Sequence, residues 1–191
     1  LSIVDDPNSQ ENPYKKQYSI SFWVYMNSSE SALLPYETTI LYYGSKEYDN
    51  DKKKWYIANP KPKVTYIYDS QLQRDVYNIY LQDSFTPTYR LNIPNQKWNQ
   101  IVFVYENNQV VLYVNGHLEK SFPISMNISQ IFTSADQIAI GDAQSSIYGS
   151  VANIIYYDYP MSKNQVVDSW NKQKYWVDGT VYVPFSRTKS S

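Results

Sequence analysis

Cysteine is absent from this chain of 191 residues, and histidine occurs once, at His117. Without cysteine there are no disulfides, no thiolate catalysis and no cysteine-based zinc site. The single histidine directly follows Asn115-Gly116, a turn pair, and turn histidines are usually solvated, so we expect no histidine-based nucleophilic triad. Glycine occurs only 5 times, and no glycine-rich phosphate-binding motif is present.

Long hydrophobic runs are also missing. No segment approaches the roughly 18 apolar residues of a membrane span. Lys and Arg total 17 against 18 Asp and Glu, which leaves a formal charge of -1 and no general attraction to nucleic acid or acidic membranes. The chain begins at Leu1 and ends in the polar Arg187–Ser191, as an excised or processed domain would, which leaves room for an upstream signal or membrane anchor.

Aromatic residues are abundant instead. Phe, Trp and Tyr make up 17% of the chain, and there are 21 tyrosines. Tyrosine suits half-buried strands, where the ring packs and the hydroxyl reaches a polar partner; the alternative is a stacking platform for sugars or bases. The length fits one domain, so we expect a single domain over residues 1–191, with a core of about 18–185 and tails at 1–17 and 186–191.

Most of the sequence has the pattern of short β-strands. Tyr18–Met26 alternates, with Ile20, Phe22, Val24 and Met26 on one face. Lys97–Ser121 contains two apolar runs joined at Glu106–Gln109, followed by a second reversal at Asn115-Gly116. The further predicted strands are Thr38–Tyr43, Lys54–Ala58, Val64–Tyr68, Asn78–Leu81, Tyr89–Ile93, Ile101–Tyr105, Val110–Val114, Gln137–Ile140, Gly149–Tyr157 and Val181–Phe185.

Loops and one helix complete the predicted organisation. Lys46–Lys54 is charged and nearly free of apolar residues, which predicts a solvated loop. The prolines of Asn59–Pro62 cannot continue a central strand. Ser162 and Gln165 form a capping box before an apolar helical repeat, so a short helix is predicted from Lys163 to about Asn171. Together these elements predict an all-β fold: a two-sheet antiparallel β-sandwich of the jelly-roll type with one short C-terminal helix.

Four motifs in a fixed order resemble the laminin-G-like, or concanavalin A-like, jelly-roll family of lectins and glucanases. The family pattern begins with a strand that contains an aromatic residue followed by Trp, and then a short strand that ends at Gly. A Trp next begins a hairpin that ends in Tyr-Val-Asn-Gly. The last motif is a strand that begins with Gly and a hydrophobic residue and is followed by a helix that starts after Met-Ser. The matching stretches are YSISFWVYMN from Tyr18, ILYYGSK from Ile40, IPNQKWNQIVFVYENNQVVLYVNGHLEKS from Ile93 and IAIGDAQSSIYGSVANIIYYDYPMSKNQVVDSWN from Ile138.

Two stretches, NIPNQKWNQIVFVYENNQVVLYVNG from Asn92 and GSVANIIYYDYPMSKNQVV from Gly149, look most like the versions found in large DNA viruses and protists. In those proteins such a domain often follows a membrane anchor or belongs to the virion, which implies an extracellular or virion-surface location.

In the segment that follows the Asn115-Gly116 reversal, we expect Leu118 to point inward and Glu119 outward.

Catalytic and metal-binding chemistry are not expected. Retaining glycosidases need two carboxylates roughly 5 Å apart, and no predicted strand carries the corresponding acid-x-acid-x-x-acid pattern. We expect no cofactor. Some members of the family bind Ca²⁺ at the sandwich rim, and Asp142 stands near such a station, but no partner acids have ligand spacing; the alternative is that Asp142 caps a turn.

Sugar recognition is the function that these residues favour. Exposed tyrosine or tryptophan rings can lie against sugar rings while an Asp or Asn fixes hydroxyls. The candidate ligand-binding residues are Tyr43, Tyr48, Trp55, Asp142 and Tyr148, each of which could instead be a packing residue. We therefore predict a non-catalytic module that binds a glycan or glycoprotein at an outer surface. The alternative is a structural or assembly domain, of a virion or a membrane-anchored surface protein, that contacts neighbouring structural proteins; a glycoside hydrolase is the third hypothesis.

Overall fold

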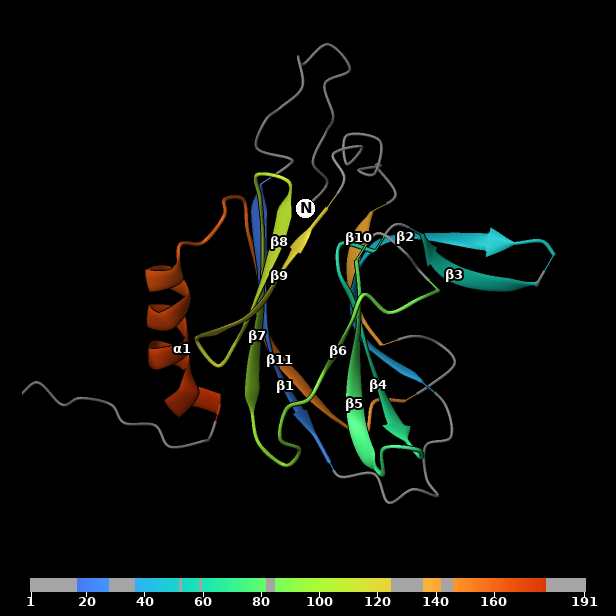
Figure 1. The fold of residues 1–191 in the computed structure, drawn as a ribbon, viewed down its shortest axis with the longest axis horizontal. Coiled ribbons are helices and arrows are strands. Elements are labelled where there is room, and N and C mark those ends of the chain that lie inside the picture. The colour runs from blue at the N-terminus through green and yellow to red at the C-terminus, as the bar shows by residue number, and fades with distance from the viewer. Residues whose placement is uncertain are drawn as a thin grey trace, which may run out of the picture.

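The computed structural model describes residues 17–27, 37–51, 53–58, 60–81, 85–124, 136–141 and 146–177. Within these ranges the chain forms antiparallel strands and one C-terminal helix (Figure 1). The predicted strand Val181–Phe185 and Asp142 lie outside the described residues. The elements are β1 (Tyr18–Met26), β2 (Thr38–Asp49), β3 (Lys54–Ala58), β4 (Lys63–Asp69), β5 (Arg74–Tyr80), β6 (Tyr89–Leu91), β7 (Asn99–Glu106), β8 (Gln109–Val114), β9 (His117–Pro123), β10 (Gln137–Ile140), β11 (Gly149–Tyr157) and α1 (Lys163–Val177).

Two antiparallel sheets face each other, which confirms the predicted β-sandwich. The helix-side sheet has the strand order β11-β1-β7-β8-β9, and α1 lies along its outer face (Figure 1). The arm-side sheet has the order β10-β2-β4-β5-β6, with β3 paired to the far end of β2. No helix within the described ranges is long and apolar enough to cross a membrane.

The core lies between the sheets and follows the predicted alternation. On β1 the side chains of Ile20, Phe22, Val24 and Met26 are fully buried in one hydrophobic cluster. Burying one side chain of this size stabilises the fold by about 1.5 to 3 kcal/mol. The other sheet contributes alternate residues in the same way. These are chiefly Ile40, Val64, Tyr66, Tyr77 and Ile79.

The hairpin of β7 and β8 forms as the sequence predicts. Asn107 and Asn108 both have positive φ angles at its turn, as do Asn115 and Gly116 at the next one. Two consecutive positive φ values give a turn whose twist matches that of the strands it joins, and Asn and Gly tolerate them best. The Asn-rich reversals therefore fix the register of β7, β8 and β9.

Leu118 does not point inward, and that expectation is wrong. The register of β8 and β9 shifts after Leu112 because β9 carries one extra residue, a β-bulge. Leu118 therefore pairs with Tyr113, on the outer side of the sheet, and is 58% exposed. Glu119 instead accepts a hydrogen bond from the Tyr89 hydroxyl, 2.7 Å away in the opposite sheet.

The charged segment Lys46–Lys54 is not a loop throughout. β2 continues past Gly44 as far as Asp49, and β3 begins at Lys54. The two strands pair from Ser45 with Ala58 to Asp49 with Lys54 and project from the sandwich as an arm (Figure 1). Charged residues are tolerated because the arm, unlike a core strand, is largely exposed on its faces. We call β2 from Ser45 onward, together with β3, the arm.

The helix begins with the predicted capping box. The backbone N–H of Gln165 donates to Ser162 Oγ, and the backbone N–H of Ser162 donates to Gln165 Oε1 at 2.8 Å. Val166 is fully buried in a second cluster with valines of β7 and β8. The helix runs to Val177, about two turns beyond the predicted end, because helical contacts with the sheet continue as far as Gln173.

Candidate functional site

Tyr43 is a packing residue at one end of the sandwich. Its ring makes edge contacts with Tyr18 and Tyr156, at centroid distances of 5.7 and 6.1 Å. The ammonium group of Lys61 lies 5.3 Å from its ring centroid, and Lys61 forms a buried ion pair with Asp136. Burial raises the pKa of Tyr43, with the nearby Tyr156 and Asp136 adding to the effect. This half-buried ring offers little surface to a ligand.

Tyr48 and Trp55 form an exposed aromatic pair on the arm. They are directly opposed in the β2–β3 ladder, and their ring centroids lie 5.3 Å apart at an interplanar angle of 62°. Tyr48 is 45% exposed and Trp55 is 61% exposed. On the other face of the arm, Tyr56 donates a hydrogen bond to Glu47 at 2.8 Å. The structure thus brings two of the five predicted ligand-binding residues together.

Tyr148 and Tyr43 lie at opposite ends of β1. The backbone N–H of Asn27 donates to the Tyr148 carbonyl, and the adjacent Gly149 pairs with Met26 at the end of β1. Tyr43 contacts Tyr18, at the start of the same strand. A strand of this length separates its ends by about 26 Å, so Tyr148 and Tyr43 cannot share a small ligand. Asp142, also the weak Ca²⁺ candidate, lies outside the described residues.

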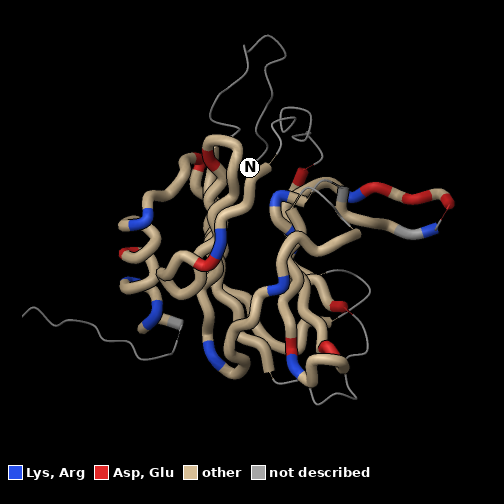
Figure 2. Tube along the Cα trace, viewed as in Figure 1, with Lys and Arg blue, Asp and Glu red and all other residues tan. Residues whose placement is uncertain are grey.

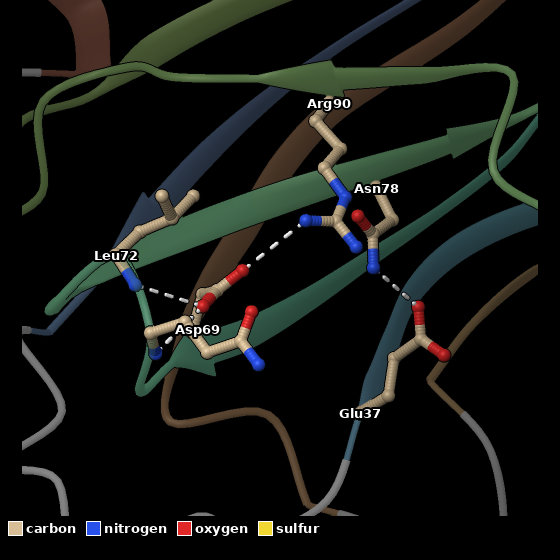
Figure 3. A network of polar contacts seen from close by, with 6 residues as sticks. Glu37, Asp69, Leu72, Asn78 and Arg90 are labelled. Carbon is tan, nitrogen blue, oxygen red and sulfur yellow. Dashed lines mark hydrogen bonds and ion pairs between the residues drawn. The ribbon is translucent and has the colours of Figure 1, made fainter.

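A polar network that the sequence did not reveal lies on the outer face of the arm-side sheet, and Figure 3 shows its contact between Glu37 and Asn78. Glu37 directly precedes β2, and its Oε1 accepts hydrogen bonds from the side chains of Thr65, Asn78 and Tyr80. The Asn78 bond is 2.9 Å long and the Tyr80 bond 2.6 Å. Thr65 and Asn78 are register partners on β4 and β5. We call Glu37 and these three donors the Glu37 network.

The pKa of the Glu37 carboxyl reflects this arrangement. Burial opposes ionisation, but the hydrogen bonds from Thr65, Tyr80 and Asn78, with the positive charge of Lys63, outweigh it and lower the pKa. The pKa of Tyr80 is raised in turn by burial and by its bond to Glu37. Glu37 is therefore ionised at neutral pH and held by neutral donors.

Two cations border the Glu37 network. The Lys63 ammonium lies 4.6 Å from the centroid of the Tyr80 ring. Arg90 is the register partner of Asn78 on β6, and its Nη1 donates to Asp69 Oδ2 at 3.2 Å. The other oxygen of Asp69 accepts backbone N–H groups of the following turn, including that of Leu72 (Figure 3). The face is polar and carries both signs of charge.

One signal could have pointed to this network. Asn is depleted in strands, and Asn78 interrupts the apolar and aromatic run from Val76 to Tyr80 in β5. The contact between Asn78 and Glu37 could not be predicted from the sequence, because the two residues are 41 positions apart and meet only through the pairing of β2, β4 and β5.

The part of the chain that the structure describes contains no group of three or more His, Cys, Asp or Glu side chains able to hold a metal ion.

The two sheets, their antiparallel order and the helix on one outer face define a lectin-type β-sandwich. The family model of the concanavalin A-like lectin/glucanases superfamily matches residues 4–167. The chain therefore belongs to this superfamily, as the sequence motifs indicated. A search of curated proteins finds no match.

Solved structures with the same fold include binding domains of botulinum neurotoxins. The binding domain of serotype D/C superposes with a TM-score of 0.55 at 14% identity, covering 84% of this chain and 37% of that one. The DC binding domain in complex with SialylT gives 0.56 at 14% identity, covering 84% and 36%. The DC binding domain in complex with rat synaptotagmin II gives 0.54 at 13% identity, covering 86% and 37%. The chain thus spans little more than a third of these binding domains.

Proposed function

We propose that this chain is a non-catalytic recognition module that binds carbohydrate, free or on a glycoprotein, at an outer surface. The observation that carries the proposal is the exposed pair of Tyr48 and Trp55 on the projecting arm. Clustered exposed apolar surface marks interaction sites on proteins, and aromatic faces can pack against sugar rings. Tyr43 and Tyr148 are not part of this site.

The surroundings of the pair suit a sugar better than an ionic ligand. Acidic and basic residues are interspersed along the arm (Figure 2), so neither sign of charge dominates. The superfamily includes lectins, and structures that share the fold were solved with SialylT and with synaptotagmin, which supports a binding role.

A glycan array tests the proposal. The purified chain should give a restricted set of hits, and Trp55→Ala should lose those that depend on the arm, because the variant removes the larger exposed ring. Leu72→Ala is the matched control, since Leu72 is also an exposed apolar residue but lies on the β4–β5 turn. Both variants should keep their melting temperature, because truncating an exposed side chain changes stability by about 0.5 kcal/mol or less. A set of hits that is unchanged in Trp55→Ala, or no hits for the unmodified chain, would overturn the proposal.

The assembly hypothesis has one observation in its favour. Trp176 is 82% exposed near the end of α1, and the neighbouring Tyr175 is exposed as well. Such rings are enriched at protein interfaces. If the chain serves assembly, light scattering across a concentration series should show association that Trp176→Ala abolishes and Trp55→Ala does not. A monomer at every concentration would count against self-assembly.

A further inference from the structure

We propose that the Glu37 network is a second ligand site, on the outer face of the arm-side sheet, that takes adjacent hydroxyl groups of a neutral saccharide. The Glu37 network and the arm would bind the same class of ligand, as the proposed function has it, but the two sites share no residue. Tyr48 lies ten residues beyond Thr38 on β2, a distance of about 33 Å along an extended strand. One sugar unit therefore cannot contact both places.

The geometry of Glu37 indicates an acceptor prepared for a ligand. All three hydrogen bonds from Thr65, Asn78 and Tyr80 reach the same oxygen, Oε1. Among the described residues, Oε2 has no hydrogen-bond partner, and Glu37 as a whole residue is exposed although its Oε1 lies against the three partly buried donors. The three bonds fix the carboxylate in place, so a ligand that binds Oε2 does not have to order it.

Asn78 provides an independent sign that a donor is missing. Its side chain is only 7% exposed, and Nδ2 is committed to Glu37. Its Oδ1 has no hydrogen-bond partner among the residues that the structure describes. Buried polar atoms are nearly always paired, so this sealed amide oxygen next to Glu37 indicates that the network has room for one further donor, such as a hydroxyl group.

The charges around the network select the class of ligand. Lys63 and Arg90 disfavour a cation, whereas Glu37 and Asp69 disfavour an anion. A hydroxyl group both donates and accepts, so one hydroxyl can donate to Glu37 Oε2 while its neighbour accepts from Arg90. Arg90 uses Nη1 for Asp69, and its side chain is largely exposed, which leaves further N–H groups for a ligand oxygen. Adjacent hydroxyls on an uncharged sugar ring match this pattern.

The test is a titration of the ¹⁵N-labelled chain, followed by backbone amide shifts and the Trp55 indole signal. The probes are lactose, cellobiose and methyl α-mannoside, with glucosamine and glucuronate as charged counterparts. At least one neutral sugar should shift the amides of Thr65 and Asn78. Glu37→Gln should weaken this response about tenfold or more, as expected when a charged acceptor is replaced by a neutral one. Glu47→Gln, which alters an exposed carboxylate on the arm, should leave it unchanged.

A second variant covers the case in which Glu37→Gln disturbs the fold. Arg90→Gln keeps every hydrogen bond of the Glu37 network and should also weaken the response at Thr65 and Asn78. If the sugars shift only the Trp55 indole signal and not the amide signals of Thr65 and Asn78, the proposal of a second site is wrong and the proposed function of the arm still holds. Shifts at Thr65 that persist in both variants, or a stronger response to either charged sugar, would also overturn it. No shift at Thr65 or Asn78 with any probe would do the same, whatever the glycan array shows for the arm.

Discussion

Gly116 lies directly beneath the indole of Trp170. A Cβ atom added to Gly116 would come within 3.3 Å of Trp170 Cε3 and 3.4 Å of two further atoms of that side chain. The adjacent His117 ring makes an edge contact with the same indole at 6.0 Å. The turn between β8 and β9 is therefore a docking point for α1, and the residue there must be small as well as tolerant of a positive φ.

Gly116→Ala should destabilise the chain by about 2 kcal/mol, through a strained φ of +77° and the close approach of Trp170. Gly141→Ala is the matched control, because Gly141 has a φ of +69° but its Cβ would meet nothing nearer than 3.8 Å. Gly141→Ala should lower the free energy of unfolding by only about 1 kcal/mol, the cost of the strained backbone. Urea denaturation of both variants checks the difference. Equal losses would show that the turn and α1 are not closely packed.

A buried polar network attaches the helix at a second point. Trp23 Nε1 donates to Gln173 Oε1 at 2.7 Å, and the fully buried Gln100 donates to Ser169 Oγ at 3.1 Å. Gln173→Ala leaves the buried Trp23 donor without its acceptor and should cost about 1 to 3 kcal/mol. In a double-mutant cycle with Trp23→Phe, the second change should cost much less once the first is present. Fully additive losses would contradict the contact.

The parts of the fold that followed from the sequence are those set by local pattern. Alternation placed Ile20 and Phe22 in the core, and the Ser162 and Gln165 pair marked the start of α1. Turn chemistry placed Asn115 and Gly116 at a reversal. Each of these features depends on residues a few positions apart, which is why a single sequence reveals them.

The rest depended on pairings between distant segments. Lys46–Asp49 resembles a solvated loop until Trp55 and its neighbours pair with it to form the arm. Glu37 gains its role only when β4 and β5 bring Thr65, Asn78 and Tyr80 beside it. Of the predicted binding residues, Tyr48 and Trp55 meet because they oppose each other in one hairpin, whereas Tyr43 packs into the sandwich end. No local pattern encodes these differences.

The bulge in β9 gives a direct test of side-chain orientation. Leu118→Lys should change the free energy of unfolding by about 0.5 kcal/mol or less, because Leu118 is exposed. Phe122→Ala, four residues on in the same strand, should cost about 3 to 5 kcal/mol, because Phe122 is buried in the core. Chemical denaturation of the two variants measures both values. A large loss for Leu118→Lys would mean that the register shift between β8 and β9 is absent.

The Glu37 network should make stability depend on pH in acid. The pKa of Glu37 is lowered from its ordinary value of 4.5 in the folded chain, so between the two values the unfolded chain binds more protons. The contribution of the ionised carboxylate is therefore complete above about pH 4.5 and is lost as the pH falls through the folded pKa. The difference in unfolding free energy between the unmodified chain and Glu37→Gln should be constant near neutrality and shrink below pH 4.5.

Thr65→Val tests whether the hydrogen bonds to Glu37, rather than acid unfolding in general, cause the pH dependence of stability. It removes one of the three donors to Glu37 Oε1 and nothing charged, so the pKa of Glu37 should rise toward 4.5. NMR titration of the Glu37 side-chain carboxyl in the unmodified chain and in Thr65→Val measures the shift directly. A Glu37 pKa that is the same in both proteins would mean that the Thr65 hydrogen bond does not lower it. A Glu37 pKa above 4.5 in the unmodified chain would mean that burial outweighs the hydrogen bonds. The acceptor inferred for the second ligand site would then be partly protonated in weak acid, and sugar binding there should weaken at a higher pH than the network predicts.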